Sequence, residues 1–182
     1  WPNQPLRLYG AGADSGTFDY FTEAIVGKAK AIRTDYQPTE DDNVTIKGVA
    51  GDTYAMGFLG YAYYEENKDK VKAVAIDHGK GCVLPSRETV LDGTYQPLSR
   101  PLFIYVNVKS LDRPEVQAFV DFYLSPAARR AIRSTGYVEL PSEAYRIGQE
   151  LVKRRKAGTF FMELPAGTPL SKFIQELDKE LR

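Results

Sequence analysis

The sequence lacks a long hydrophobic run and has few residues that bind metals through sulfur or imidazole. No stretch approaches the roughly 18 apolar residues that a membrane-spanning helix needs, although 43% of the residues are hydrophobic. Cys82 is the sole cysteine and His78 the sole histidine, which excludes an internal disulfide and a multi-cysteine zinc site. We therefore expect neither a metal ion nor a cofactor.

The chain also lacks an excess of charge of either sign. Its 24 lysines and arginines balance 24 aspartates and glutamates. Without an overall positive field, nucleic acid is not expected as a partner, and any selectivity for anions must be local. The basic run Lys153 to Lys156 ends a helix predicted over residues 143–156, where the helix dipole favours cations.

A glycine-rich and hydroxyl-rich turn near the start of the chain runs directly into an amphipathic helix. Residues 10–25 read GAGADSGTFDYFTEAI, with Phe18, Phe21 and Ile25 at helical spacing. Ser15 and its neighbours suit a helix N-cap, because a side-chain oxygen can accept an unpaired amide of the first turn. They also suit an anion site, since amides and hydroxyls would meet at the positive end of the helix dipole. The residues alone leave both interpretations open.

The remaining pattern predicts a mixture of strands and helices. Residues 6–9 are expected to form a strand before the turn, and residues 44–47, 57–60, 71–76 and 102–106 are expected to form further strands, the last of them buried on both faces. Helices are expected over residues 17–27, 52–56, 61–67, from 114 with a restart at 126, and from 169 to the end. This order favours an α/β fold with ligands at the carboxyl ends of its strands.

Three segments together resemble the substrate-binding proteins of phosphate ABC transporters, which belong to the type II periplasmic-binding-protein superfamily. They are GADSGTFDYFTEAI at 12–25, GVAGDTYAMGFLGYAYYEENKDKVKAVAI at 48–76 and TYQPLSRPLFIYV at 94–106. The resemblance implies two α/β lobes that close around one phosphate. It places the phosphate on Ser15, Gly16 and Thr17. It also implies a periplasmic or other extracytoplasmic location and ABC transporter membrane subunits as partners.

The sequence departs from this family in two respects. Some members carry an arginine four residues before the serine, where this chain has Ala11. The N-terminal part of the first lobe has no counterpart before Trp1, so the chain resembles one lobe plus the returning C-terminal part of the other. We expect residues 1–94 to be the second-lobe segment with the anion site, 95–141 the C-terminal part of the first lobe, and 142–182 a helical tail. A missing N-terminal lobe segment would then be a further partner.

Asp14 raises a separate question of selectivity. A carboxylate beside a bound anion is repulsive unless the anion donates a proton, as hydrogen phosphate can and sulfate at neutral pH cannot. The competing interpretation of Asp14 is a helix cap or an ion-pair partner.

Two other functions compete with phosphate binding. Ser15 could be the nucleophile of a phosphate-ester hydrolase, but it lacks the glycine pattern of a nucleophile elbow, and His78 is the sole histidine that could serve as its base. Alternatively, the chain could be a structural or interaction module that exposes apolar surface. We expect a binding protein rather than an enzyme.

Overall fold

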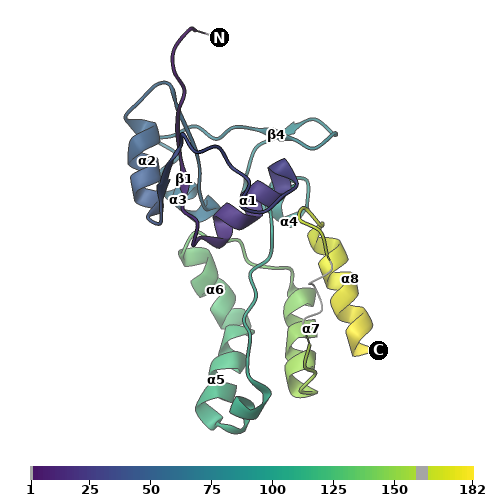
Figure 1. Cartoon of the computed structure of the whole chain (residues 1–182). Helices are drawn as coiled ribbons and strands as arrows, with labels where there is room; N and C mark the ends of the chain where they lie inside the picture. The colour runs from purple at the N-terminus through teal and green to yellow at the C-terminus, as the bar shows by residue number, and fades with distance from the viewer. Residues whose placement is uncertain (1, 159–163) are drawn as a thin grey trace. The chain divides into compact units, whose positions relative to one another are not determined.

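The structure is a computed structural model that describes residues 2–158 and 164–182, and it divides into two compact units, Trp1–Pro85 and Ser86–Arg182. The first unit is an α/β layer, and the second consists of helices and extended segments (Figure 1). The α/β fold class predicted from the sequence is confirmed. No helix among the described residues is long and apolar enough to cross a membrane.

A three-stranded parallel sheet forms the centre of the first unit. Its strands are β1 (Arg7–Ala11), β2 (Gln37–Thr39) and β3 (Ala55–Phe58), in the order β2-β1-β3. Ala11 pairs with Thr39, and Gly10 pairs with Phe58, so the carboxyl ends of the strands meet at one edge. The chain runs from β1 to one neighbour and then crosses to the other, which makes this edge a topological switch point where α/β sheets bind ligands.

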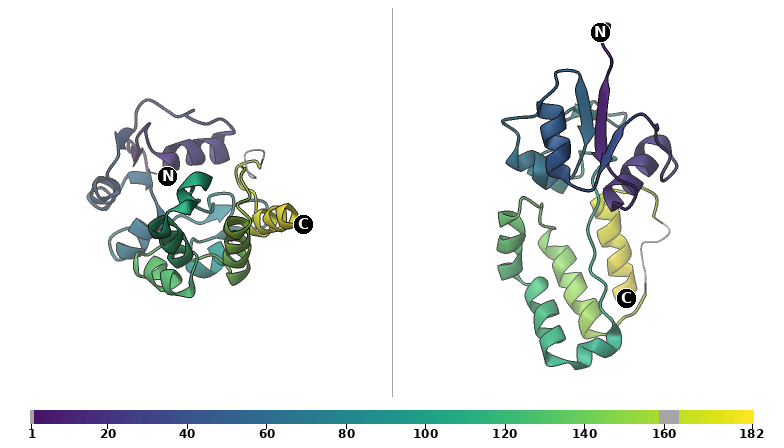
Figure 2. Two further views of the ribbon diagram at one scale, coloured as in Figure 1. Left: turned by 90° about the horizontal axis from the view of Figure 1, so that it is seen from below. Right: turned by 60° about the vertical axis from the view of Figure 1, so that its left-hand side comes forward.

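Helices cover both faces of this sheet. Helix α1 (Gly16–Val26) connects β1 to β2, and α2 (Asp42–Ala50) connects β2 to β3; Figure 2 shows the two helices on opposite sides of the sheet. This is the arrangement expected of two right-handed crossovers that run in opposite directions along the sheet, one from β1 to β2 and one from β2 past β1 to β3. Helix α3 (Tyr61–Glu66) and the two-residue antiparallel strands β4 (Ile76–Asp77) and β5 (Cys82–Val83) follow.

The apolar face of α1 differs in part from its prediction. Phe18 is buried and Phe21 stacks on Phe58 of β3 with ring centroids 4.2 Å apart, as a core-facing stripe requires. Ile25, expected on the same stripe, is 50% exposed, and Thr22 is buried in its place. The buried Thr22 hydroxyl has hydrogen-bond partners: it donates to the Phe18 carbonyl and accepts from the Lys30 amide.

The second unit is built mainly from helices. They are α4 (Arg87–Leu91), the 3-10 helix η1 (Val108–Asp112), α5 (Pro114–Tyr123), α6 (Pro126–Ser134), α7 (Ser142–Lys153) and α8 (Leu170–Leu181). Helix α7 supplies most of the core through Ile147, which is fully buried, and its buried neighbours Ala144, Tyr145 and Leu151. Helices α7 and α8 pack side by side (Figure 1).

Several predicted elements are wrong. Residues 44–47 belong to helix α2, and residues 52–54 form a turn that leads into strand β3. Residues 71–75 and 102–106 form no strand. Leu102, Phe103, Ile104 and Tyr105 are exposed rather than buried on both faces, because no described strand lies beside them.

Candidate functional site

The turn between β1 and α1 brings the four predicted site residues together at the switch-point edge. Ser15 is the N-cap of α1, with extended backbone, and its hydroxyl accepts the Thr17 amide at 3.2 Å. Gly16 and Thr17 are the first two helical residues, so the helix begins one residue before the predicted start at residue 17. Asp14 and Gly16 are exposed, and Ser15 and Thr17 are half-buried.

The first turn of α1 has amides to offer. Within the described residues, the Gly16 and Phe18 amides have no hydrogen-bond acceptor, as expected for the first turn of a helix. These amides, the two hydroxyls and the helix dipole constitute an electropositive end that suits an anion. The geometry is therefore compatible with both earlier interpretations of this turn, the cap and the anion site, and Ser15 as cap does not prevent the amides from binding a ligand.

Tyr36 fixes the position of this helix end through one ring contact and one hydrogen bond. Phe18 stacks over Tyr36, the residue before β2, with ring centroids 6.4 Å apart and nearly parallel planes. The Tyr36 hydroxyl donates to the Ala11 carbonyl at 3.2 Å. Tyr36 thus links α1, the end of β1 and the start of β2, and burial followed by the nearby Glu40 charge raises its pKa.

Glu40 is a site residue that the sequence interpretation missed. It follows β2 as the turn follows β1, so the parallel pairing of these strands brings its carboxylate to the same edge. The Asp14 amide donates to Glu40 Oε1 at 3.5 Å, and a Cβ on Gly12 would overlap that carboxylate in its present position. The residues QPTE after Tyr36 show no alternation of apolar and polar side chains, so the sequence alone does not indicate strand β2.

Carboxylates accumulate at this edge. Asp42 is a third carboxylate at this edge, besides Asp14 and Glu40, and it accepts a hydrogen bond from the Gly60 amide. Burial is the main cause that raises the pKa of Asp42, and the charges of Asp41 and Glu40 raise it further. An anion at the start of α1 would therefore lie at an edge of the sheet that also carries negative charge.

Neither arginine of this unit neutralises that charge. Arg7 lies at the amino end of β1, the opposite edge of the sheet, and pairs with Asp52 at 3.1 Å. Arg33 pairs with Asp35 at 2.6 Å, and both side chains are exposed. The place of the absent arginine at Ala11 is therefore not taken by either of them.

His78 does not contact the Ser15 hydroxyl in the part of the chain that the structure describes. In the part of the chain that the structure describes, the Ser15 hydroxyl contacts the Thr17 amide and no histidine or carboxylate. The described residues also contain no group of three or more histidine, cysteine, aspartate or glutamate side chains placed to hold a metal ion.

The chain is similar in sequence to known proteins of about twice its length. The chain is 51% identical over 178 residues to protein SphX of Synechocystis sp., covering 94% of this chain and 53% of that protein. It is 36% identical over 148 residues to the phosphate-binding protein PstS of Staphylococcus haemolyticus, covering 80% of this chain and 45% of the relative. The chain thus spans about half the length of the curated relatives it matches.

A solved structure is similar as well. The crystal structure of a possible phosphate binding protein from Planctomyces limnophilus superposes with a TM-score of 0.70 at 43% identity, covering 86% of this chain and 56% of that one. Residues 1–127 match the PBP superfamily domain, which is well over half of the sequence. The chain belongs to the PBP superfamily.

Proposed function

We propose that this chain is part of the solute-binding component of a phosphate ABC transporter and that it binds inorganic phosphate at the N-terminus of α1. The observation that carries the proposal is the pair of Gly16 and Phe18 amides, which have no acceptor among the described residues and lie beside the Ser15 and Thr17 hydroxyls at the switch point of a parallel sheet. The names of the relatives, PstS and a possible phosphate binding protein, support the choice of anion.

Binding in this proposal involves no covalent step. Amide and hydroxyl donors replace water around the phosphate oxygens, and each charge-assisted hydrogen bond contributes about 1.5–3 kcal/mol. Relatives about twice as long would add donors from a second lobe, so phosphate affinity of this chain alone is expected to be weak. The membrane subunits of the transporter and an N-terminal lobe segment are the proposed partners, at a periplasmic or other extracytoplasmic location.

The carboxylates favour an anion that carries a proton. Glu40 and Asp14 lie at the same edge as the amides, and an acceptor near the bound oxygens repels sulfate but can accept the proton of hydrogen phosphate. Glu40 would thus be a second carboxylate, besides Asp14, that favours a protonated anion.

Isothermal titration with phosphate and then sulfate, at low ionic strength, tests the proposal. The double variant Ser15→Ala/Thr17→Ala is expected to lose at least tenfold in phosphate affinity, because two hydroxyl donors are removed. The matched control Thr34→Ala/Thr53→Ala removes two hydroxyls elsewhere in the same unit and should bind like the unmodified chain. Equal affinity in the double variant and the control would contradict the proposed site.

Catalysis is the weaker alternative. The Ser15 hydroxyl has no base beside it among the described residues, so we expect no hydrolysis of a chromogenic phosphate ester. Turnover that disappears in Ser15→Ala would reverse this preference.

A further inference from the structure

The second unit contains an arginine-rich pocket that the proposed phosphate site does not use. Its volume is about 540 Å³, within the range of small-molecule sites. Four of its lining residues are arginines, Arg87, Arg129, Arg130 and Arg133, and Glu139 is the sole carboxylate among them. The lining therefore carries a formal surplus of three positive charges.

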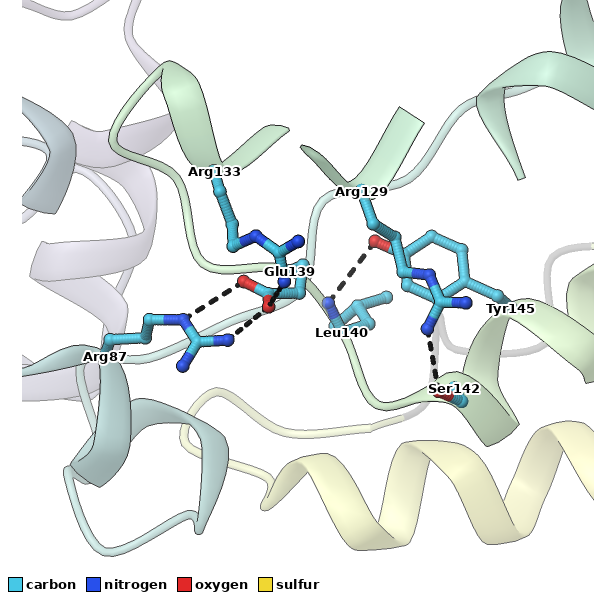
Figure 3. Close-up of polar contacts among 7 residues, drawn as sticks. All are labelled: Arg87, Arg129, Arg133, Glu139, Leu140, Ser142 and Tyr145. Atoms are coloured by element: carbon cyan, nitrogen blue, oxygen red, sulfur yellow. Dashed lines mark hydrogen bonds and ion pairs between the residues drawn. The ribbon is translucent and has the colours of Figure 1, made fainter. Parts of the chain in front are cut away.

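Glu139 organises two of these arginines. It is 7% exposed and accepts hydrogen bonds from Arg87, on α4, and from Arg133, on α6, the latter at 2.8 Å (Figure 3). The hydrogen bonds from Arg87 are the main cause that lowers the Glu139 pKa to about 2. The carboxylate consequently stays ionised and holds both guanidinium groups in place, but it can balance only one of the four charges.

Arg129 and Arg130 supply the unbalanced charge. Arg129 donates to the Ser142 hydroxyl at 2.7 Å and lies over the Tyr145 ring, 5.2 Å from its centroid (Figure 3). These contacts orient the guanidinium without neutralising it. Arg130 is exposed and forms no ion pair with any described residue.

Two helix ends and an apolar wall complete the pocket. Pro126 and Ser142, the first residues of α6 and α7, line it, so both helices direct their positive dipole ends toward it. Leu91, Leu140 and Pro141 supply apolar surface on the same lining. The pocket volume is larger than one inorganic oxyanion fills. A guanidinium group can form two parallel hydrogen bonds to the oxygens of a carboxylate or a phosphate.

The geometry points to a second binding site, in which Arg129 and Arg130 bind the phosphate or carboxylate head of a small organic anion while the leucine and proline side chains contact its apolar body. This site is independent of the α1 phosphate site. It lies wholly within Ser86–Arg182 and shares no residue with the Ser15 turn.

Titration of the chain with phenyl phosphate and with benzoate tests the assignment, because these probes share an apolar body and differ in the head. At least one is expected to bind in the millimolar range, and the tighter one identifies the head group. Arg129→Gln/Arg130→Gln should weaken that binding at least tenfold. Arg146→Gln/Arg182→Gln removes the same charge from exposed positions of the same unit outside the pocket and should leave it unchanged.

Further variants keep the test independent of folding and of the first site. Arg130→Gln alone removes a side chain without an ion pair among the described residues, so it should fold normally and still weaken binding several-fold. Ser15→Ala/Thr17→Ala should bind the probe like the unmodified chain, even if it proves to bind no phosphate. Absence of binding for both probes, equal binding in Arg130→Gln and the Arg146→Gln/Arg182→Gln control, or loss of binding in Ser15→Ala/Thr17→Ala would each overturn the inference.

Discussion

At the scale of single residues, Glu139 is the clearest case of a side chain whose protonation affects stability. Its pKa is about 2 in the folded chain against an ordinary value of 4.5, because Arg87 and Arg133 favour the charged form. Because the pKa of Glu139 is lower in the folded chain than in the unfolded chain, its ionised form stabilises the fold at every pH above the unfolded pKa. This contribution is lost as pH falls from about 4.5 toward 2.

Glu139→Gln is therefore expected to lower the free energy of unfolding at neutral pH by about 1.5–3 kcal/mol, since a buried acceptor of charged hydrogen bonds is removed. The difference from the unmodified chain should shrink as pH approaches 2. Urea unfolding at a series of pH values measures both effects, and a difference that stays constant from neutral pH to pH 2 would contradict the assigned pKa.

Asp14 and Glu40 carry the prediction on selectivity. Asp14→Asn and Glu40→Gln should each narrow the preference for phosphate over sulfate, because a neutral amide no longer repels an unprotonated anion. Competitive titration measures the affinity ratio, with Asp35→Asn, whose carboxylate pairs with Arg33, as the control. An unchanged affinity ratio in both variants would mean that neither carboxylate contributes to the selectivity for phosphate.

The candidate site was only partly predictable from the sequence at this scale. The capping residues Asp14 to Thr17 directly precede an apolar stripe, and this local pattern predicts the start of a helix. Ser15 is the N-cap of that helix in the structure. Glu40 reaches the same edge only through the pairing of β1 with β2, which is a contact between residues far apart in sequence. No local pattern encodes that pairing.

At the scale of elements, local pattern failed where short β-branched runs were ambiguous. Val44, Thr45 and Ile46 suggest a strand, but Asp41 caps the segment by accepting the Asn43 amide at 2.9 Å, and a helix forms. Thr45 and Ile46 are then buried, because α2 packs on the sheet. Packing and capping outweighed strand propensity here.

The packing of α2 on β1 depends on Gly48. A Cβ at this position would overlap the Tyr9 ring. Gly48→Ala is expected to destabilise the chain by about 1–3 kcal/mol through overpacking, despite the better helix propensity of alanine. Thermal and urea unfolding measure this loss.

A double variant separates overpacking from other causes. Tyr9→Leu removes the ring, so Gly48→Ala should cost less in that background than alone. Equal costs in the two backgrounds would mean that the ring is not the obstacle.

At the scale of the whole molecule, the division into Trp1–Pro85 and Ser86–Arg182 accounts for which strands form. The first unit contains its own three-stranded sheet, whereas residues 102–106, predicted as a buried strand, have no described strand beside them. The sequence periodicity identified an apolar segment correctly, but a strand also needs a partner. The three-part division at 94 and 141 stays a prediction.

This exposed segment is expected to drive self-association of the chain. Leu102 is 56% exposed and Tyr105 80% exposed, and adjacent exposed apolar side chains favour contact with a second copy. Sedimentation velocity at increasing concentration should show oligomers that Leu102→Lys/Ile104→Lys suppresses. Val26→Lys/Val74→Lys, at exposed apolar positions of the first unit, should not suppress them. A monomer at all concentrations would contradict this expectation.

The most direct test of the central claim is an amide NMR titration of the chain with phosphate, because the proposed donors are backbone amides. If phosphate binds at this helix end, the largest saturable shifts occur at Gly16, Thr17 and Phe18, and Ser15→Ala/Thr17→Ala reduces them. Saturable shifts confined to other residues, or no shifts at the start of α1, would contradict the claim that phosphate binds at this helix end.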